Sequence, residues 1–451
     1  MKKSSIVSTI LLLTLFLINL NAQYEFDKNK LDDYLDQLEK NNKAMLGVVI
    51  TKGEKLIYEN YIGFSSIKDN TPSSNLIKFR IGSITKMFTA TIIFQLIEEG
   101  RLTLDTKLSK FYPKIPNSTE ITISDLLSHR SGIHNFTSDK EYLQYMTYKK
   151  SKEEMLELIT NLKPDFQPNE KAVYSNSNYL LLGYIIEEIT NLPYQQELEK
   201  RITTKLNLLD TYYGNKIDTK RNEAFSYKFH EGEWHVQPET DMSIPHGAGA
   251  IVSTPKDLTV FITSLFANKL ISDSSLDQMK EINDGYGRGL LRFPFGDNFA
   301  YGYNGGIDGF VSNSAYFQNE KVAIAVLANG INYNFNDILI GILSIFFNVP
   351  FDIPDLAAKE IVLETKELKK YEGEFSSELL PLKITLKVEG DILYGQATGQ
   401  SAFPLIPFSK TEFRFEKAGI IIEFSQDTEG KVQYHTFILK QAGGNFPYIR
   451  E

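Results

Sequence analysis

The chain of 451 residues contains no cysteine, and its formal net charge of −9 is spread over interspersed acidic and basic residues. The absence of cysteine excludes a disulfide framework and lipid attachment through a cysteine, so stability has to come from core packing. Because no block of basic residues is present, nucleic acid is not expected as a partner. The G-x-S-x-G pattern of a nucleophile elbow is also absent, which argues against an α/β-hydrolase.

Long apolar runs are few. The first covers residues 6–20, follows two lysines and precedes Ala22, a pattern that predicts a secretory signal peptide at residues 1–22. A signal anchor is the alternative reading of this run. The second run, residues 338–349, is short for a membrane span and is predicted to be a core helix. We therefore expect a periplasmic or secreted protein with no membrane span after signal removal.

The remaining chain divides into a large and a small part. Residues 382–388 (LKITLKV) alternate apolar and polar side chains, and similar short runs fill the chain up to its end. These runs predict a small β-barrel at residues 368–451, after a linker at residues 353–367. The domain at residues 23–352 has predicted strands near both ends and helices between them. That order favours an α+β fold, with one antiparallel sheet flanked by helices.

The stretch FRIGSITKMFTA places Ser83 three residues before Lys86, at the start of a run whose apolar residues cover most of a helix circumference. Such a helix belongs in a core, where a lysine must reach solvent, pair with a charge or lose its proton. Helical spacing puts both side chains on one face, so a neutral Lys86 amine can accept the Ser83 proton. The alternative is a helix-capping serine beside a lysine that reaches the surface.

Two further patterns carry groups suited to the same chemistry. In YSN, the Tyr174 phenol can relay a proton and the Asn176 amide can both donate and accept hydrogen bonds. In YNGG, which begins at Tyr303, the paired Gly305 and Gly306 allow close approach to a backbone N–H that could donate to an oxyanion. Taken singly, the first is equally typical of a loop that caps a helix, and the second of a glycine turn.

Together the patterns are more specific. Three motifs occur in this order: Ser83-x-x-Lys86, Tyr174-x-Asn176 and Tyr303-Asn304-Gly305. Their order resembles the three active-site motifs of serine β-lactamases and penicillin-binding proteins, nearest to the class C and esterase-like branch. The same family is indicated by three further segments, residues 121–133, 245–258 and 301–310. The resemblance covers about residues 27–350, and the tail from about residue 365 resembles the lipocalin-like β-barrel that follows many such hydrolases.

The resemblance implies a helical subdomain beside the sheet, with Ser83 in the groove between them as the acylated nucleophile. Lys86 would then be the neutral proton acceptor and Tyr174 the group that passes the proton to the leaving group. Asn176 would hold the acyl side of the substrate, and the N–H groups of Ser83 and Gly306 would form the oxyanion hole. The remaining substrate-binding positions implied are Tyr303, Asn304 and Gly305.

One position departs from the family pattern. Tyr303 stands where the family has lysine or, in the esterase-like branch, often histidine, so the charge that would bind a substrate carboxylate is missing. We expect a serine hydrolase acting on a small ester, amide or peptide: an esterase, a D-amino-acid peptidase or amidase, or a weak β-lactamase. The alternative is a non-catalytic module that binds peptidoglycan fragments or peptides.

No cofactor or metal is expected. His129 and His134 could be suspected as a metal pair or as a catalytic base, but no cysteine or acidic residue stands at ligand spacing from them. We therefore predict structural roles for both histidines.

Overall fold

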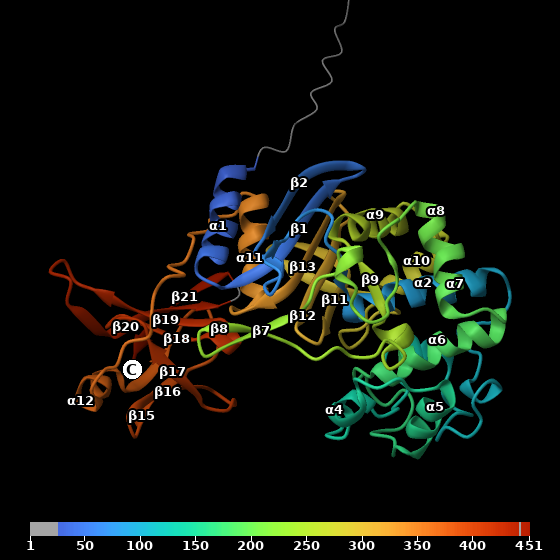
Figure 1. Ribbon diagram of the computed structural model, residues 1–451. Coiled ribbons are helices and arrows are strands. Elements are labelled where there is room, and N and C mark those ends of the chain that lie inside the picture. The colour runs from blue at the N-terminus through green and yellow to red at the C-terminus, as the bar shows by residue number, and fades with distance from the viewer. Residues whose placement is uncertain (1–25, 442) are drawn as a thin grey trace, which may run out of the picture.

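The computed structural model describes residues 26–441 and 443–451 of the chain. The predicted signal peptide lies outside these residues. The described chain forms a sheet covered by helices, a helical part beside it and a closed β-barrel on the other side (Figure 1). This arrangement confirms the predicted α+β fold with a C-terminal barrel. Within the described ranges, no helix has both the length and the apolar character needed to cross a bilayer.

The central sheet is antiparallel along its main path, in the order β10-β11-β12-β13-β1-β2. Its strands are β10 (Leu291–Phe295), β11 (Asn298–Ile307), β12 (Phe310–Phe317), β13 (Val322–Ile331), β1 (Ala44–Lys52) and β2 (Lys55–Ile62). A hairpin of β7 (Tyr227–His230) and β8 (Glu233–Val236) extends from the end of β13. β1 pairs with β13, so the first strand of the chain lies beside the last strand of the sheet. The strands predicted near both ends of the domain therefore belong to one sheet.

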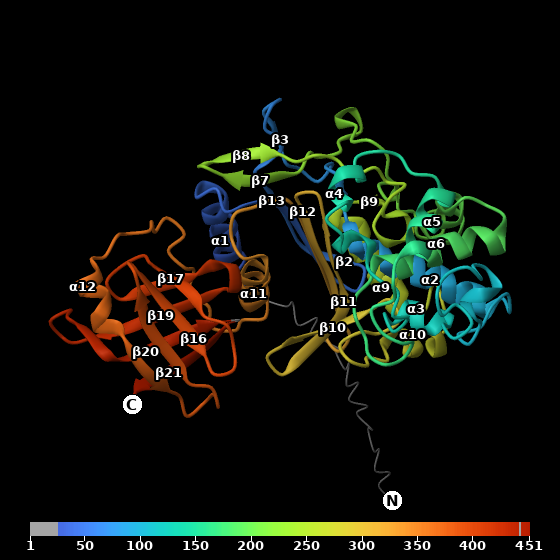
Figure 2. The same cartoon turned by 90° about the horizontal axis from the view of Figure 1, so that it is seen from below.

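Helices cover both faces of this sheet (Figure 2). On one face lie α1 (Lys28–Lys40) and α11 (Phe335–Phe346), whose residues Leu35 and Ile342 share a core with Val48 and Val326 of the sheet. On the other face lie α2 (Thr85–Glu98) and α9 (Pro255–Phe266), joined by the stacked rings of Phe88 and Phe261. The inner strands β1 and β13 are therefore buried on both sides and rich in apolar residues.

The helical part surrounds the far side of α2. It contains α3 (Ile123–Leu127), α4 (Tyr142–Tyr145), α5 (Lys152–Asn161), α6 (Asn176–Thr190), α7 (Tyr194–Leu198), α8 (Thr204–Leu206) and α10 (Asp273–Lys280). Residues all around α2 are buried, as its apolar circumference predicts. The turn before α2, which carries Ser83, contacts β11 of the sheet, and α2 contacts α6 of the helical part, so Ser83 lies at the junction between the two parts.

A small three-stranded sheet lies at this junction. It has the order β5-β9-β6, formed by β5 (Phe79–Arg80), β9 (Ile251–Ser253) and β6 (Tyr212–Tyr213). In it, Arg80 of β5 pairs with Val252 of β9. Since β5 ends three residues before Ser83, this pairing fixes the chain just ahead of the nucleophile candidate.

The C-terminal part is an eight-stranded barrel closed by pairing of its first and last strands, with Phe375 opposite Arg450. Its strands are β14 (Gly373–Ser376), β15 (Ile384–Glu389), β16 (Ile392–Ala397), β17 (Phe403–Pro407), β18 (Glu412–Phe415), β19 (Ile420–Gln426), β20 (Val432–Gln441) and β21 (Gly444–Arg450). Helix α12 (Thr365–Leu368) precedes them. The barrel has its own apolar core, which includes Phe413 and Phe437. Its independence as a domain stays a prediction.

Candidate active site

Ser83 lies in a short 3-10 turn, Gly82–Ile84, that leads directly into α2. Lys86 follows in the first turn of the helix, and its Nζ atom is 3.0 Å from the Ser83 Oγ atom. Ser83 is partly exposed, whereas Lys86 is fully buried. The predicted contact along one helix face is therefore present, and the lysine does not reach solvent.

Tyr174 and Asn176 reach the same point from the N-terminal end of α6. The Tyr174 hydroxyl is 2.6 Å from the Ser83 Oγ atom and donates to the Asn176 Oδ1 atom at 3.1 Å. Lys86 Nζ donates to the same Oδ1 atom at 2.8 Å. Four of the predicted site residues thus form one hydrogen-bonded group. Tyr174 lies 91 positions after Ser83, and Asn176 lies 90 positions after Lys86.

The Lys86 Nζ atom is surrounded by oxygen acceptors, which would hold the three hydrogens of an ammonium or two hydrogens of a neutral amine. In the described part of the chain, its partners are Ser83 Oγ, Asn176 Oδ1 and the carbonyl oxygen of Ala248, the last at 2.8 Å. The amide and carbonyl oxygens only accept hydrogen bonds, so they take both hydrogens of a neutral amine. The nitrogen lone pair is then left facing the Ser83 hydroxyl, which is the arrangement a proton acceptor needs.

Burial sets the protonation states of this group. It lowers the pKa of Lys86 well below its usual value, because an ammonium loses its hydration there. It raises the pKa of the Tyr174 phenol for the corresponding reason, against a smaller lowering by the hydrogen bond to Ser83. The two shifts favour a neutral amine beside a protonated phenol, so the group can move a proton without holding a fixed charge.

The end of β11 lies against the turn that carries Ser83. A Cβ atom added at Gly82, whose φ is +50°, would stand 2.8 Å from the backbone nitrogen of Gly306. Ser312 Oγ on the next strand donates to the Ile81 carbonyl oxygen at 2.9 Å and holds the two segments together. Glycine at position 82 is thus required both by its left-handed backbone and by this close approach.

The side chains of Tyr303 and Asn304, in the third motif, form hydrogen bonds with other residues of the protein. Tyr303 is only 3 % exposed, and its hydroxyl is 3.2 Å from the His129 Nε2 atom. The Asn304 Oδ1 atom accepts a hydrogen bond from Asn313 Nδ2 at 2.7 Å. Burial raises the pKa of the Tyr303 phenol, so it stays protonated. The Tyr303 side chain therefore offers no charge to a substrate.

His129 supports Tyr303 and Tyr174 from behind. Its Nδ1 atom accepts a hydrogen bond from the Ser175 N–H at 3.2 Å, so in the neutral ring the proton is on Nε2, which donates to Tyr303. Its ring centroid lies 4.7 Å from that of Tyr174. Burial holds the pKa of His129 well below its usual value, because a charged ring would lose its hydration there. This placement agrees with the structural role predicted for it.

His134 also holds a loop in place. Its ring nitrogens lie 2.7 Å from an Asp165 carboxylate oxygen and 3.1 Å from one of Asp139. The hydrogen bond to Asp165 is the main reason that its pKa is raised. In the residues the structure describes, no group of three or more His, Asp or Glu side chains is arranged to hold a metal ion.

A cavity of about 600 Å³ opens beside Ser83, Asn176 and Gly306. Its apolar lining includes Phe136, Tyr142, Leu143, Met146, Ile307 and Phe310, and Lys228 of β7 adds a cation. None of these side chains was predicted from the sequence to line the site, nor was Thr137, whose Oγ1 accepts from Asn176 Nδ2 at 2.9 Å, nor the Ala248 carbonyl. No spacing in the sequence links them to Ser83, although residue 248 lies inside one of the family-like segments.

The chain matches the Beta-lactamase family model over residues 31–339. It is 25% identical over 434 residues to penicillin-binding protein 4* of Bacillus subtilis (strain 168), covering 89% of this chain and 94% of that protein. It is 27% identical over 311 residues to the teichoic acid D-alanine hydrolase of Staphylococcus aureus (strain NCTC 8325 / PS 47), covering 64% of this chain and 74% of that protein.

Among solved structures, the octameric penicillin-binding protein homologue from Pyrococcus abyssi is similar in fold, with a TM-score of 0.64 and 23% identity. The match covers 94% of this chain and 99% of that one. The likeness therefore extends over both the sheet-and-helix part and the barrel.

Proposed function

Because the chain belongs to the Beta-lactamase family, we propose that it is a secreted or periplasmic serine hydrolase that cleaves an ester or amide through an acyl-enzyme on Ser83. One observation carries this proposal: the Ser83 Oγ atom lies within hydrogen-bond distance of both Lys86 Nζ and the Tyr174 hydroxyl. A nucleophile needs an adjacent base, and Lys86 meets that need because its two amine hydrogens are already held by oxygen acceptors.

In acylation, the Ser83 oxygen bonds to the substrate carbonyl carbon while its proton moves to the Lys86 amine. The carbonyl oxygen becomes an anion, for which the N–H groups of Ser83 and Gly306 are the proposed donors. The Ser83 N–H lies in the first turn of a helix, where N–H groups have no intrahelical acceptor. Losing one such donor typically costs about 3 kcal/mol of transition-state stabilisation.

The leaving group then departs with a proton from Tyr174, and Lys86 returns the proton it took to the phenol. In deacylation, water attacks the acyl carbonyl, gives its proton to the same pair, and the Ser83 oxygen leaves and regains its hydrogen. Every proton taken up is thus given back, and no metal or cofactor enters the scheme.

The substrate class follows from the cavity and from one relative. A relative named for removing D-alanine from teichoic acid supports a D-aminoacyl ester or a similar small acyl compound as substrate. The cavity beside Ser83 is lined mainly by apolar side chains and suits an acyl group with apolar parts. Because Tyr303 is buried and neutral, substrates without a free carboxylate on the leaving group are favoured.

The same Tyr303 is the observation that favours the second candidate, a non-catalytic module that binds peptidoglycan fragments or peptides. A protein of that kind would keep the fold and the cavity but would not be acylated.

Intact-mass analysis after treatment with a fluorophosphonate separates the two candidates. We expect one added label on the wild type and none on Ser83→Ala. Ser138→Ala, which changes an exposed serine next to a cavity residue, should label like the wild type. Lys86→Ala should slow labelling by about a hundredfold or more, since proton transfer contributes that much. Labelling that survives Ser83→Ala, or a Lys86→Ala rate within a few fold of the wild type, would contradict the mechanism.

A further inference from the structure

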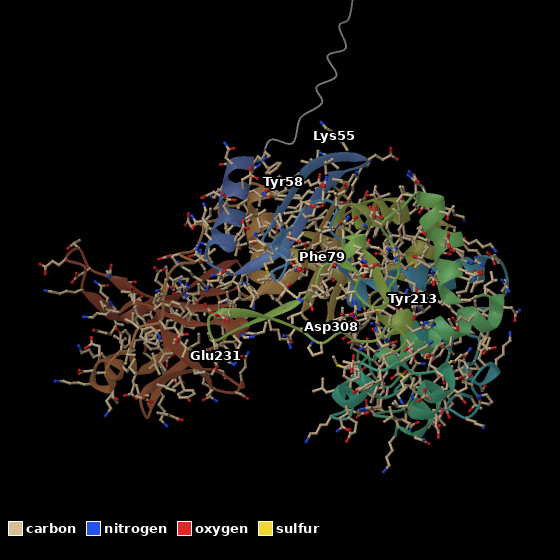
Figure 3. The ribbon with its side chains drawn as sticks, in the orientation of Figure 1. Lys55, Tyr58, Phe79, Tyr213, Glu231 and Asp308 are labelled. Atoms are coloured by element: carbon tan, nitrogen blue, oxygen red, sulfur yellow. The ribbon has the colours of Figure 1, made fainter. Side chains whose placement is uncertain are left out.

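A buried ion pair joins the two backbone segments that carry the proposed oxyanion donors. Arg80 stands three residues before Ser83, and Asp308 stands two residues after Gly306. The Arg80 Nη1 atom is 2.9 Å from the Asp308 Oδ2 atom, and the two side chains are 2% and 1% exposed. Figure 3 marks Asp308 and Phe79, the neighbour of Arg80, where the sheet meets the helical part.

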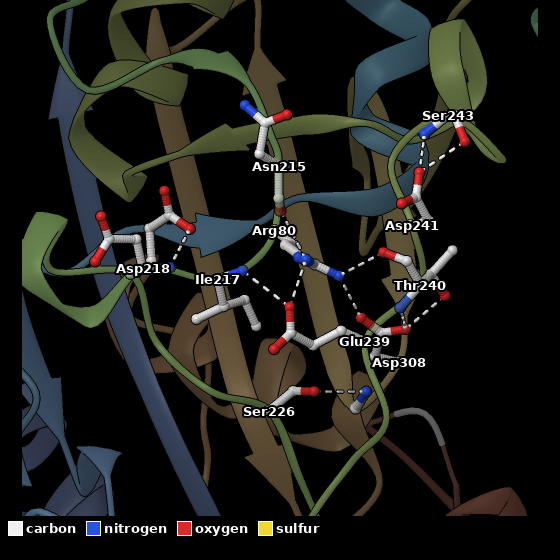
Figure 4. Close-up of polar contacts among 12 residues, drawn as sticks. Arg80, Asn215, Ile217, Asp218, Ser226, Glu239, Thr240, Asp241, Ser243 and Asp308 are labelled. Atoms are coloured by element: carbon white, nitrogen blue, oxygen red, sulfur yellow. Dashed lines mark hydrogen bonds and ion pairs between the residues drawn. The ribbon is translucent and has the colours of Figure 1, made fainter. Parts of the chain in front are cut away.

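Further hydrogen bonds fix the orientation of both partners (Figure 4). The Asp308 Oδ1 atom accepts from the Thr240 N–H at 3.0 Å and from the Thr240 hydroxyl at 2.7 Å. The Arg80 guanidinium donates to the carbonyl oxygens of Thr240 and Asn215, at 3.0 and 2.9 Å, and to a Glu239 carboxylate oxygen at 3.2 Å. These contacts hold both side chains in place, with Asp308 at the edge of the cavity beside Ser83.

The backbone at Asp308 needs such support. Its φ is +56°, in the left-handed region that residues other than glycine seldom adopt, and it forms the turn between β11 and β12. The next residue, Gly309, donates its N–H to the Ser226 Oγ atom at 3.0 Å. The turn that follows Gly306 is therefore held by specific contacts in addition to the tolerance of aspartate for a left-handed backbone.

We propose that Arg80 and Asp308 are positioning residues that set the relative placement of the Ser83 and Gly306 N–H groups, and so the stabilisation of the oxyanion. The inference rests on the proposed function, because it presupposes acylation of Ser83. Its physical basis is that preorganised donors stabilise a developing charge only when their distance to it is fixed before the reaction. A bond between segments 80–83 and 306–308 fixes that distance.

Asp308→Asn tests the proposal in the full chain. The amide keeps the shape of the side chain but removes the charge and turns a donor or a weaker acceptor toward Arg80. The assay compares p-nitrophenyl butyrate with its thiono analogue, in which sulfur replaces the carbonyl oxygen and fits the oxyanion hole poorly. We expect kcat/KM for the oxygen ester to fall about tenfold, mostly in kcat, with a much smaller change for the thiono ester.

Glu197→Gln is the matched control. Glu197 is also fully buried and paired with an arginine, Arg201, but the pair lies in the helical part on α7 and the following turn. It should lower thermal stability while leaving the oxygen-to-thiono ratio at the wild-type value. If Asp308→Asn does not fold, Thr240→Val removes only the hydroxyl donor to Asp308 and should shift the ratio in the same direction by less.

An unchanged ratio in Asp308→Asn, or an equal change in Glu197→Gln, would overturn the positioning role while the wild type remains an active, labelled enzyme. A wild type that hydrolyses neither ester and is not labelled at Ser83 would overturn the proposed function, and the positioning role with it.

Discussion

Lys86 is a side chain whose burial serves its chemistry. A buried lysine is costly in its charged form, and here the surrounding acceptors hold the hydrogens of the neutral form. The protein thus keeps the amine uncharged at a lower pH than a lysine in water, and so keeps it available as a base. The desolvation that lowers the pKa is a property of the whole core around α2 and not of one neighbouring charge.

The rate of acylation should therefore depend on pH through Lys86. Below its lowered pKa the amine is charged and cannot accept the Ser83 proton, so kcat/KM for a neutral ester falls as pH falls. The unfolded chain binds the extra proton up to a pKa near 10.5, so the free energy of unfolding rises with pH between the lowered pKa and that value. Stopped-flow acylation by p-nitrophenyl acetate from pH 5 to 9 measures the first effect.

The residual acylation rate of Lys86→Ala should not fall with pH in this way. A pH dependence shared by the wild type and Lys86→Ala would remove Lys86 as the titrating base, and a wild-type rate that still rises about tenfold per pH unit at pH 9 would contradict the lowered pKa of Lys86.

A second prediction concerns the effect of Tyr303 on substrate choice. A neutral phenol bound to His129 cannot offer the charge that lysine would, which costs about 1–2 kcal/mol, or about tenfold, toward substrates that end in a carboxylate. We expect the wild type to hydrolyse p-nitrophenyl butyrate with a higher kcat/KM than a chromogenic cephalosporin. Tyr303→Lys and Tyr303→His should narrow the gap, and Tyr303→Phe should leave it unchanged. A wild-type preference for the cephalosporin would refute this role.

Some contacts of the site residues could be predicted from the sequence, and others could not. Helical spacing alone predicted that Ser83 and Lys86 meet, but the arrival of Tyr174 could be expected only from the resemblance to a family. The Ala248 carbonyl could not be found in either way, because any residue type carries one. The contact of His129 with Tyr303 depends on a left-handed backbone at His129, with a φ of +58°, for which no local pattern gives a signal.

Among the elements, α6 and the turn at residues 246–248 are packed backbone against backbone. A Cβ atom added at Gly247 would stand 2.7 Å from the Tyr179 carbonyl oxygen and 2.9 Å from the Gly183 Cα atom. Because of this close packing, the turn lies near α2, where the Ala248 carbonyl oxygen accepts a hydrogen bond from Lys86 Nζ. Two glycines that face each other across an interface thus set the position of one acceptor in the site.

Gly247→Ala should therefore separate the Ala248 carbonyl from the amine. Overpacking of this kind costs about 1–3 kcal/mol of stability, and a small misplacement of a catalytic group slows acylation by about tenfold or more. Gly341→Ala is the comparison, because its added Cβ would stand 2.5 Å from a Tyr34 ring atom between α11 and α1, away from the site. Both variants should unfold at lower temperature, but only Gly247→Ala should acylate more slowly. Equal acylation rates would contradict the link.

The strands with a clear apolar signal were the predictable elements. β1 and β13 are nearly continuous apolar runs, and the barrel strand β15 alternates apolar and polar residues with a period of two. The three-stranded sheet β5-β9-β6 could not be predicted, since strands of two or three residues are too short to show a period. Its partners come from three distant parts of the chain, so only the tertiary fold brings them together.

In the whole molecule, the barrel is joined to the rest by an extended connector. Residues 349–364 form neither helix nor strand, and Val362 within them is 97% exposed. The connector is attached at points, as where the Ile361 N–H donates to the Pro407 carbonyl oxygen at 2.9 Å. A cavity of about 410 Å³, lined by Asp337, Phe351 and Arg414 among others, separates α11 from the barrel wall.

Limited proteolysis should cut this connector first, between about residues 350 and 368, because exposed irregular segments are the preferred sites of cleavage. Mass spectrometry of the products should give a large fragment that keeps the fluorophosphonate label and a small fragment of the size of the barrel. Cleavage confined to other sites would indicate that the barrel is docked too firmly to count as a separate domain.

The uncharged amine at Lys86 also has a consequence for the medium in which the protein works. Dissolved salt weakens the attraction between exposed charges, but it has little effect on a buried base that carries no charge. The chemical step on an uncharged substrate is then the same in dilute and in saline surroundings. The proposed secretion would place the protein where the cell does not control the ions, and such a base works there without regulation of its solvent.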